Sequence, residues 1–192
     1  YFAKIKFYVG IDIDYDGLFS RGGGAVSRYI ALRNKHINWP EMVFIQVDGG
    51  ALFNYAAQSS IIKSMSDDNK KLIEKYLSGK IMYNMISCQF AIHYFLENET
   101  KFNNFCQNLQ TLIAKDGHFV VTTFDAEEVL KALNGKSKYT LRYTTPDGTK
   151  MTFFEIIAKY STDLDIASCG LGNAIDVHNS WISEPEIGRA HV

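Results

Sequence analysis

The chain has only three cysteines, almost no excess of one charge over the other, and no long run of apolar residues. Cys88, Cys106 and Cys169 form an odd, widely spaced set without a C-x-x-C pair, which argues against a disulfide framework and a zinc site. No segment approaches the roughly 18 consecutive apolar residues of a membrane span, and the first residues lack the order of a secretory signal. The sequence therefore fits a protein of a reducing compartment, without membrane insertion or secretion.

The charges are balanced, with 20 basic and 21 acidic residues and a net charge of −1. No global basic field would attract nucleic acid, so a polyanion would have to be met locally. Apolar residues make up 46% and aromatic residues 14% of the 192 residues, which is typical of an ordered globular protein. At about 150 residues per domain, this length predicts one domain, with or without a small appendage.

The residues at both ends of the sequence indicate how the chain relates to its parent gene. The chain opens on Tyr1 only a few residues before its first apolar run, which indicates natural sequence upstream. Residues 186–192 resemble the translation of a common sequencing adapter. We therefore expect 1–185 to be part of a natural domain and 186–192 to be a processing scar. Sequencing the parent gene past Pro185 and finding the same codons again would contradict this expectation.

Apolar periodicity predicts strands and helices that alternate along the chain. Strands are expected over 7–13, 42–47, 80–88 and 118–124, and helices over 25–35, 70–77, from 100 or 103 to 114, and over 125–133. A loop is expected over 14–24 and a turn over 115–117. Residues 139–144 and 151–160 flank Pro146-Asp147-Gly148, which signals a β-hairpin, and 174–177 is the last regular segment. The pattern predicts an α/β fold with an open, mostly parallel sheet, helices on both faces and a late hairpin.

Acidic residues follow two of the predicted strands. Ligands bind at the carboxyl ends of parallel strands, so Asp12 and Asp48 are candidate binding residues. Asp12 is interpreted as the acid that ends the second strand of a Rossmann-like unit and accepts hydrogen bonds from a nucleoside ribose. The glycine turn of such a unit lies about 20 residues upstream, which would precede Tyr1. Asp48 either reaches the adenine edge or belongs to an ordinary turn with Gly49 and Gly50.

Two motifs near the start of the chain have competing interpretations. Residues 12–17 match D-x-D-x-D-G, the first half of a calcium loop. Gly23 stands where that loop needs its glutamate, and a strand is predicted where it needs a helix, so calcium binding is disfavoured. Gly22-Gly23-Gly24 follows a loop and not a strand, so it is interpreted as a flexible turn before a helix and not as a phosphate loop.

The segment S-C-Q-F-A-I-H-Y-F at 87–95 is the most unusual stretch of the chain. A histidine beside aromatic residues is often a packed core residue. Here, however, Gln89, His93 and Tyr94 cluster just past a predicted strand end, where a ligand would bind. Both interpretations stand, and we favour ligand binding.

This segment closely resembles the signature of messenger-RNA cap guanine-N7 methyltransferases. Other stretches match in the same order: Tyr8-Val9-Gly10-Ile11-Asp12, Arg28-Tyr29, Phe44-Ile45-Gln46-Val47-Asp48, G-H-F-V-V-T-T-F at 117–124 and Gly172-Asn173-Ala174-Ile175-Asp176-Val177. The similarity covers most of 7–177, and the chain resembles capping enzymes of large cytoplasmic DNA viruses. It implies a Rossmann-like S-adenosylmethionine-dependent methyltransferase fold whose first strand and glycine loop are missing from this chain, so that 1–185 is a partial cap methyltransferase domain.

The resemblance implies S-adenosylmethionine as cofactor and the capped 5′ end of mRNA as partner. Asp12 would hold the ribose and Asp48 the adenine side. Gln89 and Tyr94 would contact the methionine end of the cofactor. Guanylyltransferase and triphosphatase domains on the same parent chain are further implied partners. The implied location is the cytoplasm, in a viral factory or virion, or the nucleus for a cellular protein.

The resemblance also implies two cap contacts. His93 would face the cap guanine, and Arg28 would meet the phosphate bridge of the cap, unless it only forms a solvated helix face. Guanine N7 has a free lone pair and loses no proton when it attacks a sulfonium methyl group, so the reaction needs no general base. Catalysis would rest on in-line positioning and electrostatic complementarity, with His93 as a recognition residue.

Three other functions remain open. A methyltransferase for another acceptor would share Asp12 and Asp48 but would have no evident use for the cluster at 89–94; methyl acceptance by a free cap analogue separates the two. A methyltransferase-like module could bind a partner or RNA without methyl transfer. A nicotinamide dehydrogenase is the third, because Rossmann units of that class also end their second strand in an acid.

Overall fold

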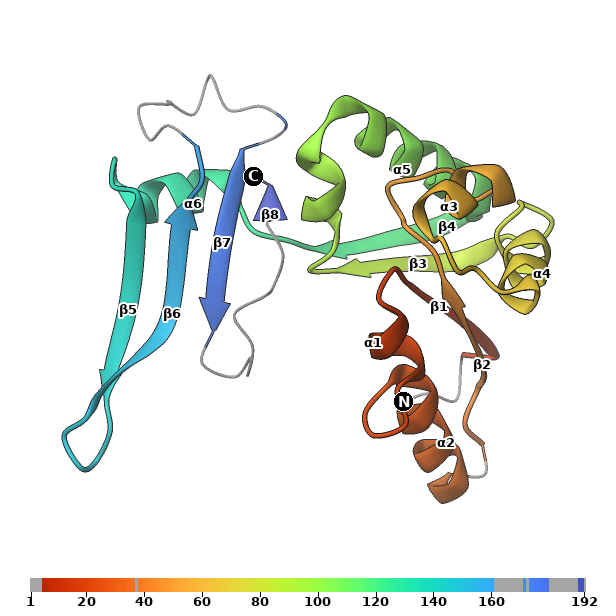
Figure 1. Cartoon of the computed structure of the whole chain (residues 1–192), viewed down its shortest axis with the longest axis horizontal. Coiled ribbons are helices and arrows are strands. Elements are labelled where there is room, and N and C mark those ends of the chain that lie inside the picture. Colours follow the sequence, from red (N-terminus) through yellow and green to blue (C-terminus); the bar gives the residue numbers. More distant parts are fainter. Residues whose placement is uncertain (1–4, 37, 161–170, 172, 180–189, 192) are drawn as a thin grey trace. The chain divides into compact units, whose positions relative to one another are not determined.

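The computed structural model describes residues 5–36, 38–160, 171, 173–179 and 190–191. The chain divides into two compact units. The first unit consists of Tyr1–Asn84 and Asn104–Gly117, and the second of Met85–Asn103 and His118–Val192. Helices and strands alternate along most of the chain (Figure 1), so the predicted mixed α/β class is confirmed. Among the described residues, no helix is both long enough and apolar enough to cross a membrane.

The first unit is built around a pair of parallel strands. Its own elements are β1 (Phe7–Asp12), α1 (Tyr15–Phe19), α2 (Ala25–Lys35), β2 (Glu41–Gln46), α3 (Tyr55–Ile61) and α4 (Asp67–Tyr76). β1 and β2 run parallel, from Phe7 opposite Glu41 to Asp12 opposite Gln46. Ile45, Val47 and Ile73 are among the apolar residues buried in this unit. The parallel pairing brings the carboxyl ends of β1 and β2 to one edge.

Helix starts in the first unit follow local capping signals. The Ser66 hydroxyl accepts a hydrogen bond from the Asn69 N–H at 3.2 Å and caps α4, whose first turn is acidic, as its helix dipole favours. The predicted loop over 14–24 is wrong in part, because Asp14 accepts the Asp16 N–H and starts α1. The sequence analysis also missed α3, where Asn54 accepts the Ala57 N–H at 2.9 Å. Each of these short helices begins at a residue whose side chain caps it.

Gly24 ends the glycine run at the start of α2 and has no room for a side chain. A Cβ at this position would lie 2.6 Å from the Ser20 nitrogen and 2.8 Å from the Leu18 carbonyl oxygen, whereas nothing lies within 4 Å of one at Gly22. We expect Gly24→Ala to lower the free energy of unfolding by about 2 kcal/mol, as overpacking against backbone does. Gly22→Ala is the matched control and should leave the melting temperature unchanged. Equal thermal unfolding curves for the two variants would contradict this account.

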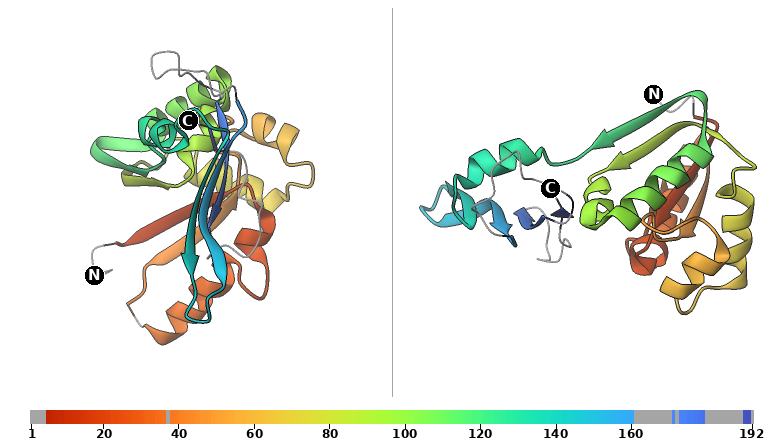
Figure 2. Two further views of the ribbon diagram at one scale, coloured as in Figure 1. Left: turned by 90° about the vertical axis from the view of Figure 1, so that its left-hand side faces the viewer. Right: turned by 90° about the horizontal axis from the view of Figure 1, so that it is seen from above.

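Three elements run from one unit into the other. These are β3 (Tyr83–Gln89), α5 (Glu99–Leu112) and β4 (Ile113–Thr122). β3 and β4 form a two-stranded sheet and lie side by side in Figures 1 and 2. The predicted turn over 115–117 is wrong, because β4 begins at Ile113 and passes through it. Asp116 accommodates this path with a φ of 62°, a left-handed conformation that aspartate tolerates better than most residues.

The second unit contains an antiparallel sheet. Its own elements are the 3₁₀ helix η2 (Ile92–Glu97), α6 (Ala126–Leu133), β5 (Lys138–Thr144), β6 (Lys150–Ala158), β7 (Ala174–Asn179) and β8 (Ala190–His191). The sheet has the order β5-β6-β7-β8, and β5 and β6 form the predicted hairpin, visible in Figure 1. Val129 and Leu133 of α6 pack with Ile156, Ile175 and Val177 to form the core of this unit.

The described strands therefore form a parallel pair, the β3-β4 pair and an antiparallel four-stranded sheet. The prediction of one mostly parallel sheet is not confirmed. β8 falls within the expected processing scar and pairs with β7, Ile175 lying opposite Ala190. Residues 186–189 and 192 lie outside the described residues, and the origin of 186–192 stays a prediction.

Candidate functional site

Asp12 and Asp48 lie at the same edge of the parallel strand pair. Asp12 is the last residue of β1, and its carbonyl oxygen accepts the Val47 N–H at 2.9 Å. Asp48 follows directly after Val47, beyond the end of β2. Asp12 is exposed and Asp48 is half-buried. The first unit thus brings together the two acids that the sequence analysis selected.

The acidic motif at 12–17 forms local turns. Asp12 Oδ1 accepts the Asp14 N–H at 3.0 Å, and Asp14 Oδ1 accepts the Asp16 N–H at the same distance. These bonds turn the chain out of β1 and into α1. Nowhere in the part of the chain that the structure describes do three or more histidine, cysteine, aspartate or glutamate side chains form a group that could hold a metal ion.

The Asp48 loop, residues 48–54, is held by buried amides that the sequence analysis missed. Gln58 of α3 and Asn108 of α5 are both buried polar residues, and both bond to the backbone of this loop. Their only signal in the sequence is an amide in the middle of each helix. Since Asn108 reaches across 55 positions to Phe53, no local pattern could reveal its partner.

Arg28 projects from the first half of α2 and is exposed. Its guanidinium donates a hydrogen bond to the carbonyl oxygen of Gly23, in the turn just before the helix. A Cβ added at Gly22 or Gly23 would meet nothing within 4 Å, so this turn is open to solvent. The structure therefore places a cation beside an open backbone segment.

In the second unit, Gln89 ends β3 and its side-chain amide is oriented by β4. Its Nε2 donates to the Val120 carbonyl at 3.3 Å and to the Ser87 hydroxyl at 3.0 Å. The Thr122 hydroxyl donates to Gln89 Oε1. The amide is exposed but held on both its nitrogen and its oxygen, which reduces the rotamer freedom that ligand binding would have to remove.

Phe90 is a second residue that the sequence analysis did not select. Its φ of 51° is left-handed, a conformation that a bulky aromatic side chain rarely adopts. The Phe90 N–H donates to the Thr122 carbonyl at 2.8 Å, and its ring is 57% exposed and centred 6.0 Å from that of Phe124. Strained backbone of this kind clusters at functional sites. Its position directly after Gln89, inside the unusual segment, was the available signal.

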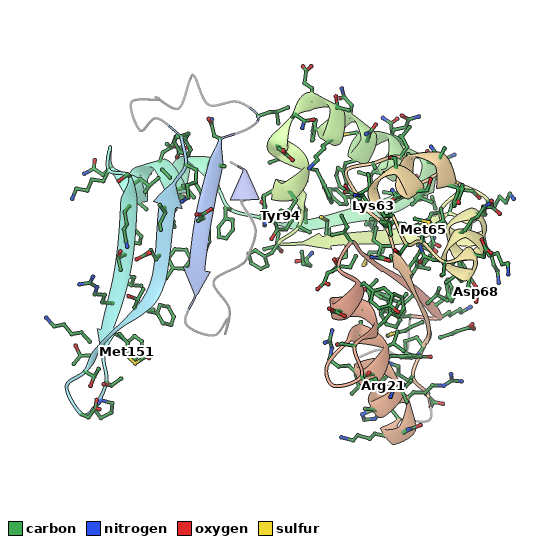
Figure 3. The ribbon with its side chains drawn as sticks, in the orientation of Figure 1. Arg21, Lys63, Met65, Asp68, Tyr94 and Met151 are labelled. Atoms are coloured by element: carbon green, nitrogen blue, oxygen red, sulfur yellow. The ribbon has the colours of Figure 1, made fainter. Side chains whose placement is uncertain are left out.

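His93 and Tyr94 lie on η2, which begins two residues after Phe90. His93 is 1% exposed, and its ring centroid lies 4.4 Å from that of Tyr94 and 5.6 Å from that of Phe124. Tyr94, labelled in Figure 3, is half-buried. The strand β8 lies against η2. His93 is thus a packed residue in this structure, while the expected contact with a cap guanine stays a prediction.

Cys88 precedes Gln89 on β3 and carries the buried thiol of the unusual segment. Burial raises the pKa of the Cys88 thiol, so the group stays protonated at neutral pH. A protonated thiol is a poor nucleophile. Cys88 is therefore a poor candidate for a nucleophile in the segment 87–95.

Comparisons with known proteins identify the family. The model of the mRNA (guanine-N(7))-methyltransferase domain matches residues 2–138. The chain is 44% identical over 183 residues to a "Probable mRNA-capping enzyme" of Acanthamoeba polyphaga mimivirus, which covers 95% of this chain and 15% of that protein. It is 32% identical over 63 residues to an "mRNA cap guanine-N(7) methyltransferase" of Drosophila melanogaster, covering 33% of this chain and 15% of that protein.

The chain thus spans about 15% of the length of these two relatives. The family match covers more than half of the chain and includes β1 to α6, with every residue selected above. The chain belongs to the mRNA (guanine-N(7))-methyltransferase domain family, whose methyl donor is S-adenosylmethionine.

Proposed function

We propose that this domain transfers the methyl group of S-adenosylmethionine to N7 of the guanine cap of mRNA. The observation that carries the proposal is the family match over 2–138, which includes both strand-end acids and the whole segment 87–95. The parallel pair β1-β2, with Asp12 and Asp48 at its carboxyl edge, supports a Rossmann-like arrangement in the first unit.

The cofactor contacts follow from the chemistry of each side chain. The exposed Asp12 carboxylate accepts hydrogen bonds from the ribose hydroxyls, and Asp48 accepts from the adenine side. Gln89, with its amide oriented by β4, and Tyr94 contact the methionine end. These roles are proposals that binding measurements on single variants can separate.

The cap contacts are His93 and Arg28. The His93 ring packs against the rings of Tyr94 and Phe124, which favours recognition of a base over proton transfer. Arg28 is exposed and carries the charge that a phosphate bridge requires. The open turn at Gly22 and Gly23 leaves room beside it.

The proposed reaction requires little covalent chemistry from the protein. The N7 lone pair attacks the sulfonium methyl carbon, the N–C bond forms as the C–S bond breaks, and sulfur keeps the bonding electrons. Positive charge moves from sulfur to the guanine ring, and no proton is transferred at N7. The protein contributes in-line positioning and a complementary electrostatic environment, and the protonated Cys88 is not required.

Guanylyltransferase and triphosphatase domains on the same parent chain are proposed as partners. The name of the mimivirus relative, "Probable mRNA-capping enzyme", and the 15% of its length that this chain covers support a parent protein with further domains.

Radiolabelled methyl transfer tests the proposed function. The full-length protein is incubated with labelled S-adenosylmethionine and the same RNA bearing either a guanine cap or a 5′-triphosphate. We expect label only in the capped RNA. Transfer to both RNAs would contradict the cap assignment and indicate another acceptor. Cofactor binding without transfer to either would replace the proposal with a non-catalytic binding module.

A further inference from the structure

We propose that Gln58 is a positioning residue of the S-adenosylmethionine site, which acts by fixing the backbone of the Asp48 loop. The inference rests on the proposed function, in which Asp48 meets the adenine side of the cofactor. Gln58 itself contacts no substrate. With Asn104 and Asn108 of α5 it forms an amide clamp, a name used here for these three side chains. The clamp bonds to the backbone of residues 48–54.

The amide clamp donates to five consecutive backbone carbonyls. Gln58 Nε2 lies 2.9 Å from the oxygen of Asp48 and 3.2 Å from that of Leu52. The Asn108 amide reaches the oxygen of Ala51 at 2.8 Å and that of Gly49 at 3.4 Å. The Asn104 amide reaches the oxygen of Gly50 at 3.1 Å. Every carbonyl from Asp48 to Leu52 is therefore bonded to a side chain of α3 or α5.

Both backbone polar groups of Asp48, its N–H and its carbonyl, bond to the side chain of Gln58. Its N–H donates to Gln58 Oε1 at 2.8 Å, while its carbonyl accepts from Gln58 Nε2. The carboxylate is fixed in turn, because Asp48 Oδ1 accepts the Gly50 N–H at 2.8 Å. No group in the described ranges donates a hydrogen bond to the second oxygen, Oδ2, so this oxygen remains for a ligand.

Two members of the amide clamp, Gln58 and Asn108, are buried, which makes these amides costly to build. Gln58 is 0% exposed and Asn108 is 6% exposed. A buried amide stabilises a fold only when its hydrogen bonds are made. An apolar side chain could fill the same volume and would need no hydrogen-bond partner. These amides specify one backbone conformation for the Asp48 loop. That conformation directs the loop carbonyls toward the helices and leaves the Asp48 carboxylate for the cofactor.

Asn69 of α4 offers a matched control. Its Oδ1 accepts the Gln46 N–H at 2.9 Å and its Nδ2 donates to the Gln46 carbonyl at 2.8 Å. This is the same two-sided bond that Gln58 makes to Asp48, placed two residues earlier on the chain. Asn69 is also buried, with 9% of its surface exposed. Deleting either amide leaves a backbone N–H and a backbone carbonyl without their side-chain partner, but of these two residues only Gln58 bonds to the Asp48 loop.

The test compares Gln58→Met with Asn69→Leu, substitutions that keep the side-chain length and remove the amide. Dissociation constants for S-adenosylmethionine are measured by calorimetry on the full-length protein, alongside kcat and KM for methyl transfer. In Gln58→Met we expect the dissociation constant and the cofactor KM to rise about tenfold or more, with kcat within about threefold at saturating cofactor, as for a lost positioning contact. In Asn69→Leu the melting temperature should fall to a similar degree while the dissociation constant stays within about twofold.

Equal weakening of cofactor binding in both variants, or none in Gln58→Met, would overturn the positioning role. Should Gln58→Met fail to fold, Asn104→Ala removes only the donor to the Gly50 carbonyl; a rise in its dissociation constant supports the proposal, and an unchanged value contradicts it. A wild-type protein that binds S-adenosylmethionine but methylates no capped RNA would contradict the proposed function, and the binding comparison would still decide the role of Gln58.

Discussion

Asp12→Ala is expected to weaken S-adenosylmethionine binding by about a hundredfold, because hydrogen bonds between a carboxylate and ribose hydroxyls are charge-assisted and costly to lose. Asp12 is exposed at the end of β1, so its truncation leaves the core of the first unit intact. The loss should therefore appear mainly in cofactor affinity, with only a small change in thermal stability from the lost bond to the Asp14 N–H. Calorimetric titration with S-adenosylmethionine measures it directly.

Two further variants distinguish a specific contact between Asp12 and the ribose from a general effect of negative charge near the site. Asp12→Asn keeps an acceptor for the Asp14 N–H and should lose about tenfold in affinity, since the charge is removed but the shape is kept. Asp16→Ala removes an exposed carboxylate from the first turn of the nearby α1 and should change affinity by less than about twofold. Similar losses in Asp12→Ala and Asp16→Ala would show a general charge effect and refute a specific ribose contact.

His93→Ala is expected to lower kcat on capped RNA by about a hundredfold while the S-adenosylmethionine dissociation constant stays within about threefold. The reason is that the proposed role of His93 lies with the guanine and not with the cofactor. His93 is 1% exposed and packs against Tyr94 and Phe124, so the alanine variant will also be less stable. Both constants must therefore be measured well below its melting temperature.

Controls for His93 distinguish recognition from packing. His93→Phe retains a ring between Tyr94 and Phe124 and removes the two nitrogens, so it should regain stability but not turnover. His118→Ala changes an exposed histidine of the same unit and should leave both constants unchanged. If His93→Ala lost cofactor affinity and turnover equally, or if His93→Phe restored turnover, His93 would be a packing residue only.

Much of the fold could be predicted because its signals are local. The β-branched and aromatic run before Asp12 forms β1, and α2 occupies the predicted range. Ser66 caps α4, and Asp125 caps α6 by accepting the Glu127 and Glu128 N–H groups. Each of these features is decided by neighbouring residues, so a single sequence carries the information.

The short helices α1 and α3 were missed although their caps are local, but two other errors came from features that distant residues decide. The turn expected at Lys115 to Gly117 gave way to strand pairing, since β4 continues through it beside β3. The antiparallel direction of β7 depends on its pairing with β6, and no local pattern records it. Tertiary pairing overrides local turn preference when enough backbone hydrogen bonds are gained.

In the candidate site, too, some residues are revealed by the local sequence and others only by contacts between distant residues. The acids after two strands and the segment 87–95 could be selected from the sequence, because residue type and position relative to a strand end suffice. Gln58 and Asn108 could not, because their bonds to Asp48 and Phe53 span 10 and 55 positions. The burial of His93 likewise depends on packing against Phe124, 31 positions away.

The central claim is that the accepted methyl group resides on N7 of the cap guanine. Capped RNA labelled from radioactive S-adenosylmethionine should be digested with nuclease, and the products separated by chromatography against authentic standards. The account predicts that all label elutes with the cap structure that carries 7-methylguanine. Label in an internal nucleotide, or on a ribose 2′-oxygen of the first transcribed residue, would contradict it, because the 2′-oxygen reaction requires the removal of a proton that attack by N7 does not.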